Sequence, residues 1–245
     1  MNHLRARILA FKWLLNGTIS LFDFFSLMLP LELRSTKTKS TLFGKPFFGS
    51  SATVLSQKGE IIGSNQYHIE LIKDGDSVMD AGSNLGMFSV VVANKYPHCK
   101  IYAFEPTPST FELLQENTKS YPNIVCFNLA LGDICGKTFI KDYPFREICN
   151  HIADEGIPID MKTIDSLNLP MDFLKMDTEG YEANILKGAA ETIKKYKPII
   201  AMSAYHKPED KTELPAVLNS IVPYNCELRH DCEEDLICKP EPFIT

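Results

Sequence analysis

The residues best suited to chemistry lie in a glycine-containing turn that follows an apolar stretch. The turn reads Asp80-x-Gly82-x-Asn84-x-Gly86. Gly82 and Gly86 carry no Cβ, so the backbone can turn sharply and approach a ligand closely. Glu105 ends a second apolar stretch roughly 20 residues later, the spacing at which an acidic side chain reaches ribose hydroxyls. This order predicts a site for a nucleoside-bearing ligand.

The charges in the turn indicate which nucleoside would bind. A dinucleotide fingerprint has the form G-x-G-x-x-G and presents backbone amides to a pyrophosphate. Here Asp80 precedes the first glycine, and Asn84 occupies the second glycine position. A carboxylate at that place repels a pyrophosphate but accepts hydrogen bonds from an ammonium group. The pattern therefore favours a zwitterionic nucleoside such as S-adenosylmethionine over a nicotinamide dinucleotide.

A second group of candidates follows the apolar run at residues 173–176. Asp177 and Glu179 come directly after it, and Gly180 permits a tight turn into a helix. Ligands of open α/β sheets bind beyond the carboxyl ends of the strands. We therefore expect both carboxylates at the same crevice as Glu105, where they contact the cofactor or take a proton from the substrate. The alternative is that they only cap the helix that begins near Tyr181.

A third group, at residues 203–208, contains a histidine. His206 follows another apolar run, and a histidine with a pKa near neutrality can take a proton from a hydroxyl group. Tyr205 and Lys207 are candidates for the substrate entrance, although an ordinary surface position explains Lys207 better. A divalent ion held by Asp177 and Glu179 is another way to activate a hydroxyl. The ligand set is incomplete, so no metal is assigned.

From residue 76 onward, stretches typical of strands alternate with stretches typical of helices. This alternation predicts a mostly parallel sheet covered by helices on both faces. The predicted strands are 78–80, 100–105, 124–131, 173–176 and 198–204, and the hairpin strands are 226–230 and 236–239. The predicted helices are 86–96, 109–119 (capped by Ser109), 181–196 and 213–221. Residues 134–161 show no clear period and are interpreted as an insertion.

The first 40 residues differ in character from the rest. Residues 4–15 have a basic amphipathic pattern, residues 19–29 are strongly apolar, and residues 35–40 form a polar joint. We predict a helical extension at 1–40 and the main domain at 41–245. No stretch is suited to span a bilayer, and no signal peptide is evident. Helices packed on the main domain are the simplest interpretation, and peripheral membrane contact through residues 1–33 is the alternative.

Composition narrows the functional classes. The chain has 245 residues and a net charge of −6, so it lacks the basic character expected of a nucleic-acid-binding protein. Its seven cysteines are odd in number and form no C-x-x-C motif, which predicts reduced thiols in a cytoplasmic protein. Cys226, Cys232 and Cys238 fall on the predicted hairpin but are not expected to meet. The oligomeric state is not predicted.

Seven motifs in a fixed order carry a resemblance to a known family. They are DAGSNLGMFS at 80–89, AFEPTP at 103–108, NLALGD at 128–133, TID at 163–165, FLKMDTEGYE at 173–182, LKGA at 186–189 and YHKP at 205–208. From about residue 75 to 230 the chain resembles the FkbM family of S-adenosylmethionine-dependent methyltransferases. The resemblance implies a Rossmann-like class I sheet of seven strands with the last strand antiparallel. It also implies O-methylation of a hydroxyl on a sugar, a glycan or a secondary metabolite.

Carried over by position, the resemblance assigns roles to individual residues. The implied cofactor contacts are Asp80, Gly82, Ser83, Asn84, Gly86, Glu105, Ala130 and Asp177, and the implied catalytic residues are Asp177, Glu179 and His206. Two alternatives stay open: a binding protein that keeps this fold without catalysis, and a nicotinamide-dependent dehydrogenase. We expect residues 134–161 and the N-terminus to select the acceptor.

Overall fold

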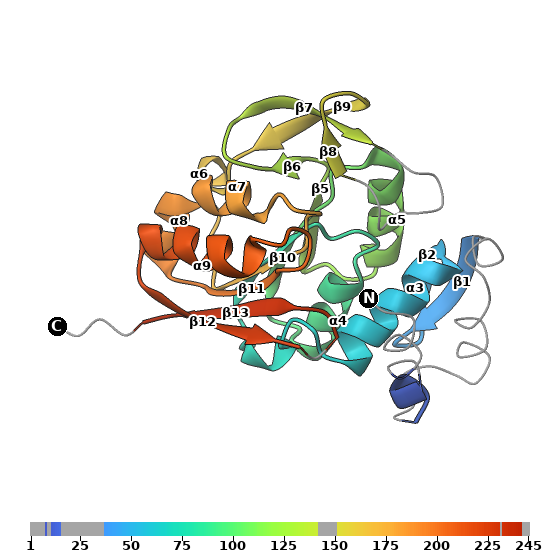
Figure 1. The fold of residues 1–245 in the computed structure, drawn as a ribbon. Helices are drawn as coiled ribbons and strands as arrows, with labels where there is room; N and C mark the ends of the chain where they lie inside the picture. Colours follow the sequence, from blue (N-terminus) through green and yellow to red (C-terminus); the bar gives the residue numbers. More distant parts are fainter. Residues whose placement is uncertain (1–7, 9–10, 16–36, 142–150, 231, 242–245) are drawn as a thin grey trace.

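A computed structural model describes residues 8, 11–15, 37–141, 151–230 and 232–241, and its centre is a seven-stranded sheet (Figure 1). The strand order across this sheet is β12-β13-β11-β10-β3-β4-β5. The strands are β3 (Ser77–Ala81), β4 (Lys100–Phe104), β5 (Ile124–Phe127), β10 (Phe173–Met176), β11 (Ile199–Ser203), β12 (Tyr224–Arg229) and β13 (Asp235–Pro240). Strands β3, β4, β5, β10 and β11 are parallel, whereas β13 runs antiparallel to β11. The predicted seven-stranded sheet with an antiparallel last strand is confirmed.

The sheet separates two apolar cores because side chains alternate between its faces. In β3, Val78 belongs to one core and Met79 to the other, and Phe173 and Leu174 divide in the same way in β10. Helix α4 (Met87–Lys95) covers the first core. Helices α7 (Glu182–Lys187), α8 (Ala190–Tyr196) and α9 (Asp210–Ile221) cover the second. The chain leaves β3 toward β4 and later returns on the other side of β3 as β10, so strand order reverses between these two strands. A ligand crevice is expected at such a point.

Three predicted helices differ from the observed ones, and the one predicted at 213–221 begins earlier, at Asp210. The predicted helix 181–196 is two helices, because the Asp165 carboxylate accepts hydrogen bonds from the backbone N–H groups of Glu191 and Thr192 and starts α8 anew. Asp165 lies in the short helix α6 (Ile164–Leu167). In helix α5 (Pro108–Thr118) the N-cap position is Thr107 and not Ser109, since proline is well suited to the first helical position, and the Thr107 side chain makes no capping hydrogen bond.

A second, smaller sheet was not predicted. It has the order β6-β9-β7-β8, with β6 (Ala130–Leu131), β7 (Gly136–Lys141), β8 (His151–Ala153) and β9 (Ile157–Lys162). The predicted strand 124–131 therefore divides between the two sheets. The Asn128 amide donates to the carbonyl oxygens of Glu105 and Pro106, which fixes the chain at the point of division.

The segment that precedes the main sheet also forms unpredicted elements. A hairpin of β1 (Lys37–Leu42) and β2 (Lys45–Ser50) leads into α3 (Ser51–Gln57), the π-helical turn η2 (Lys58–Gly63) and the short helix η3 (Ile69–Leu71). Apolar residues of this segment, including Phe47, Val54 and Ile61, join the core beneath α4. Residue 40, the predicted domain boundary, lies inside β1. Most of the predicted extension 1–40 is outside the described residues.

Residues 11–15 of the N-terminal region are helical. The Trp13 ring is buried against Gly59 and Gly63, and its Nε1 donates to Ser64 Oγ at 3.0 Å. Within the described residues, no helix has the length and apolarity needed to cross a membrane.

The prediction that all cysteines are reduced is wrong for one pair. Cys226 and Cys238 form a disulfide, because the register of β12 against β13 places them directly opposite each other with 4.0 Å between their Cα atoms. Spacing along the sequence did not reveal this register. Cys99, Cys126, Cys135 and Cys232 are free thiols.

We predict that Gly59→Ala displaces the Trp13 ring. A Cβ at residue 59 would lie 2.2 Å from a ring atom of Trp13, too close for the present packing. Because Trp13 is the chain's single tryptophan, acrylamide quenching of its fluorescence reports on this contact alone. We expect stronger quenching in Gly59→Ala than in the unaltered protein. Quenching in Gly136→Ala, where a Cβ meets nothing within 4 Å, should equal that of the unaltered protein. Equal quenching in the two variants would contradict this packing.

Candidate active site

A pocket of about 260 Å³ opens beyond the carboxyl ends of β3, β4 and β10. The turn after β3 contributes Gly82, Ser83 and Asn84, and Glu105 follows β4. Asp177 and Glu179 follow β10, and Tyr205 follows β11. Most of the predicted site residues therefore line one pocket, including Ala130 of the smaller sheet, whereas Asp80, Gly86 and His206 are not among its lining residues.

Close packing of two loops explains the glycine at position 82. Its φ is +73°, and a Cβ there would lie 1.9 Å from the carbonyl oxygen of Asp177. The backbone N–H groups of Gly82 and Ser83 donate to the carbonyl oxygen of Phe104 at 3.1 and 2.9 Å. The turn is therefore held between β4 and the loop after β10. Gly86 starts α4 with a φ of +85°.

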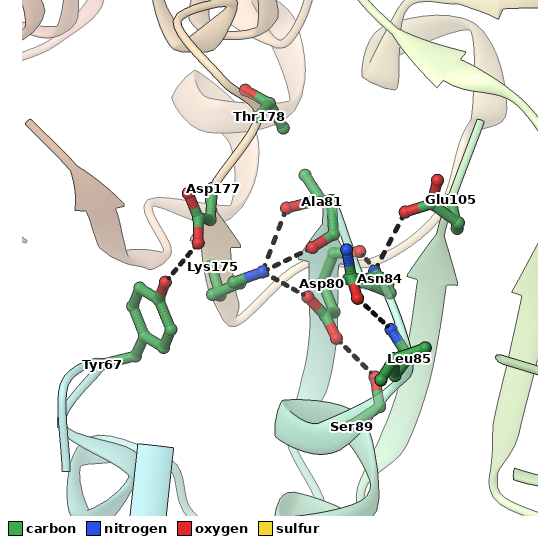
Figure 2. Close-up of polar contacts among 12 residues, drawn as sticks. Tyr67, Asp80, Ala81, Asn84, Leu85, Ser89, Glu105, Lys175, Asp177 and Thr178 are labelled. Atoms are coloured by element: carbon green, nitrogen blue, oxygen red, sulfur yellow. Dashed lines mark hydrogen bonds and ion pairs between the residues drawn. The ribbon is translucent and has the colours of Figure 1, made fainter. Parts of the chain in front are cut away.

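Asp80 lies under the turn and not on the pocket surface. Its carboxylate is fully buried, with Oδ1 3.0 Å from Lys175 Nζ and Oδ2 accepting from Ser89 Oγ at 2.7 Å (Figure 2). Lys175 Nζ also donates to the carbonyl oxygen of Gly82 at 2.8 Å. Asp80 thus forms an ion pair with an ammonium group, but this group belongs to the protein and not to a ligand. Its placement indicates that it positions the turn through Lys175 and does not contact a ligand directly.

Glu105 is held in place at the end of β4 with its carboxylate at the pocket. Its Oε2 accepts from the backbone N–H of Asn84 at 3.0 Å, and its Oε1 accepts from that of Thr107 at 2.8 Å. Figure 2 shows Glu105 beside Asn84, whose φ of +50° turns its N–H toward the carboxylate. Burial raises the pKa of Glu105 to about 7 despite these hydrogen bonds. A ligand that donates hydrogen bonds would stabilise the charged form.

Two tyrosines hold the carboxylate of Asp177, and sequence reasoning missed one of them. Tyr67 is 2% exposed, and its hydroxyl donates to Asp177 Oδ2 at 2.8 Å (Figure 2). The Tyr205 hydroxyl donates to Oδ1 at 3.4 Å. Burial, together with the charge of Asp177, holds the pKa of Tyr67 well above its usual range, so this tyrosine stays a donor. No sequence signal marked Tyr67, because it lies 110 positions from its partner.

His206 lies among three carboxylates. Its Nε2 is 3.4 Å from Asp177 Oδ1 and 3.8 Å from Glu179 Oε2, and its Nδ1 is 3.2 Å from Glu182 Oε1. Burial by itself would lower the pKa of His206. The contact with Glu182 and the charges of Asp177 and Glu179 outweigh it and raise the pKa to about 9. The expected pKa near neutrality is therefore wrong, and at neutral pH the ring is a cation that cannot accept a proton.

The contacts of Asp177 and Glu179 do not support the alternative that these carboxylates only cap the helix near Tyr181. The carboxylate that satisfies the turn is that of Glu182, whose Oε1 accepts from the N–H of Thr178 at 2.8 Å and from its hydroxyl at 3.1 Å. Asp177 and Glu179 line the pocket instead. Burial and the charge of Asp177 raise the pKa of Glu179 to about 7.

Among the described residues, one group has the side chains and proximity to hold a metal ion. Ligand atoms of Asp177, Glu182 and His206 all lie within 4.8 Å of one another. The group differs from the Asp177 and Glu179 pair considered from sequence. In the structure these side chains pair with one another, and the metal stays unassigned.

Part of the pocket comes from residues that precede the glycine turn. Ser56, Gln57, Glu60, Ile61 and Tyr67 line it, and we call these five residues the upstream wall. They belong to α3, η2 and the segment before η3. Sequence reasoning placed acceptor selection in residues 134–161 and the N-terminus. Ile140 and Ile152 of the smaller sheet do line the pocket, whereas residues 142–150 lie outside the described part.

Comparisons with known proteins identify methyltransferases as similar proteins. Residues 80–230 match the Methyltransferase FkbM domain. Hexuronic acid methyltransferase AglP of Haloferax volcanii is 28% identical over 156 residues, which cover 60% of this chain and 64% of that protein. Methyltransferase sdnD of Sordaria araneosa is 40% identical over 174 residues, covering 54% and 67%. The crystal structure of Methyltransferase FkbM from Methylobacillus flagellatus KT has a TM-score of 0.57 at 22% identity, covering 94% of this chain and 58% of that one.

The strand order, the glycine turn and the position of the pocket define a class I methyltransferase fold. The chain belongs to the FkbM methyltransferase family, as its motifs predicted. It spans less than two thirds of the Haloferax volcanii relative and of the Methylobacillus flagellatus structure.

We predict that His206→Gln lowers stability in a pH-dependent way. Because folding raises the pKa of His206 from 6.5 to about 9, its stabilising contribution is complete below pH 6.5 and is lost as the pH rises through about 9. The shift corresponds to about 3 kcal/mol. Urea unfolding should show the largest difference from the unaltered protein at pH 6.5 and a small one at pH 9. A difference that is constant over this range, or that matches the exposed control His98→Gln, would refute the assignment.

Proposed function

We propose that this protein transfers a methyl group from S-adenosylmethionine to a hydroxyl oxygen of a sugar, a glycan or a secondary metabolite. The observation that carries the proposal is a single pocket with Glu105 at the end of β4 and the Tyr67–Asp177 pair at the end of β10. Family membership supports methyl transfer, and the name of the Haloferax volcanii relative supports a sugar-type acceptor.

The charges in the pocket fit this cofactor better than a dinucleotide. Glu60, Glu105, Asp177 and Glu179 line the pocket, while Lys175 is the one cationic lining side chain in the described ranges and is paired with Asp80. A pyrophosphate would meet carboxylates without a free cation. A sulfonium and an ammonium group would instead compensate them. The same geometry disfavours the dehydrogenase alternative.

The residues that would hold the cofactor follow from their placement. Glu105 would accept from the ribose hydroxyls, the turn at 82–84 would lie against the nucleoside, and Ala130 would contact the base. When bound, S-adenosylmethionine supplies a methyl group that is already activated for transfer. Alignment of the acceptor oxygen with that methyl group then accounts for most of the catalysis.

Asp177 is the proposed general base. Its carboxylate lies at the pocket and accepts a hydrogen bond from Tyr67. The His206 cation, which contacts the other carboxylate oxygen, stabilises the negative charge of Asp177. Asp177 would take the proton of the acceptor hydroxyl as the new bond to oxygen forms, a contribution of roughly 10²- to 10⁴-fold. His206, being protonated, would position Asp177 and not remove the proton itself.

We predict that Glu105→Ala weakens S-adenosylmethionine binding by about tenfold or more, because a charged hydrogen-bond acceptor for the ribose is lost. Calorimetric titration of the folded variant measures this directly. Glu112→Ala, an exposed position in α5, is the control and should bind normally. Unchanged affinity in Glu105→Ala would remove the ribose assignment, and preferential binding of NAD by the unaltered protein would favour the dehydrogenase.

We predict that Asp177→Asn reduces methyl transfer by about 100-fold or more while cofactor affinity changes little. Asparagine keeps the size of the side chain and an oxygen that accepts from Tyr67, but it cannot take a proton. The measurement is S-adenosylhomocysteine formation across a panel of sugars and hydroxylated metabolites. The exposed Asp160→Asn serves as the control. Full activity in Asp177→Asn would eliminate it as the base, and cofactor binding without turnover of any acceptor by the unaltered protein would favour the binding-protein alternative.

A further inference from the structure

The upstream wall lies outside the residues that match the family domain. The match begins at residue 80, whereas the wall is formed by Ser56, Gln57, Glu60, Ile61 and Tyr67. Tyr67 ties the wall to Asp177, the proposed base, through a 2.8 Å hydrogen bond. The wall therefore borders the region where an acceptor hydroxyl would have to lie.

The polar groups of this wall are mainly hydrogen-bond acceptors. Glu60 is half-buried, and its Oε1 accepts from Ser56 Oγ at 2.6 Å, which orients the carboxylate. The Gln57 side-chain oxygen is buried and has no hydrogen-bond partner within the described part of the chain. A buried carbonyl oxygen without a partner is uncommon in a folded protein, and a small rotation of the Gln57 side chain toward the pocket would let it accept from a bound hydroxyl. Burial raises the pKa of Glu60, and the charge of Asp177 adds to this shift.

The charge balance of the wall limits what it can bind. Glu60 and Asp177 are both acidic, and within the described residues that line the pocket no unpaired lysine or arginine faces them. Hydroxyl groups donate to such acceptors, whereas a carboxylate on the acceptor molecule would be repelled.

We propose that Glu60 and Gln57 bind hydroxyl groups of the methyl acceptor and thereby select a neutral, polyhydroxylated, sugar-type acceptor over an acidic sugar. The proposal rests on the proposed function and specifies its substrate class. It also separates this chain from the hexuronic acid specificity in the name of the Haloferax volcanii relative.

The test compares neutral hexosides with the matching uronic acids, using p-nitrophenyl glycosides as probes. Two readouts are needed: S-adenosylhomocysteine formation, and calorimetric binding of each glycoside to the protein saturated with S-adenosylhomocysteine. We expect the unaltered protein to prefer neutral members by about tenfold or more in kcat/KM. We expect Glu60→Gln to raise KM for neutral members about tenfold and to narrow the preference, because a neutral amide no longer repels a carboxylate. Gln57→Met should weaken neutral glycosides while leaving the exclusion of acidic ones intact.

The outcomes separate the two levels of the proposal. Glu112→Gln, outside the pocket, should match the unaltered protein in every readout. Three results would overturn the role of the upstream wall. They are a preference of the unaltered protein for the uronic acids, an unchanged preference in Glu60→Gln, and failure of every neutral glycoside while S-adenosylmethionine still binds. Failure to bind S-adenosylmethionine at all would instead overturn the proposed function.

Discussion

The ion pair between Asp80 and Lys175 is the interaction on which the rest of the site depends. The two residues lie opposite each other in the register of β3 and β10, the strands between which the sheet order reverses. Both side chains are almost completely buried, and Lys175 additionally binds the carbonyl oxygen of Gly82. Loss of one partner would leave a buried charge uncompensated, a cost of about 3–5 kcal/mol. The pair therefore couples the glycine turn to the strand that carries Asp177.

The same pair sets the electrostatic character of the pocket. Because Asp80 compensates Lys175, the carboxylates of the pocket have no lysine or arginine partner among the described residues that line it. The negative charge of Asp177 is instead stabilised by the His206 cation and by a neutral hydroxyl donor, Tyr67. Such a pocket suits a positively charged methyl donor and an acceptor that brings hydroxyl groups.

The pocket is also a composite of two parts of the chain. In the proposed function, the family domain would supply the cofactor side through the turn after β3 and through Glu105. The segment from α3 to Tyr67 supplies a wall that is anchored in the core beneath α4 by residues such as Val54 and Ile61. This wall lies outside the residues that match the family domain. Under the proposed function, the cofactor and the acceptor would therefore be bound by different parts of the chain.

The sequence by itself determined the features that depend on local geometry. Strand periodicity predicted the main sheet, and the glycines and Glu105 marked its ligand edge, because a turn and the end of a strand are specified by neighbouring residues. Tertiary structure decided the rest. The register of β12 and β13 paired Cys226 with Cys238, and packing brought Tyr67 to Asp177. Three neighbouring carboxylates raise the pKa of His206, so that it is a cation and not the expected base. These outcomes depend on distances between residues far apart in the chain, and the electrostatics of a buried group depend on every charge around it.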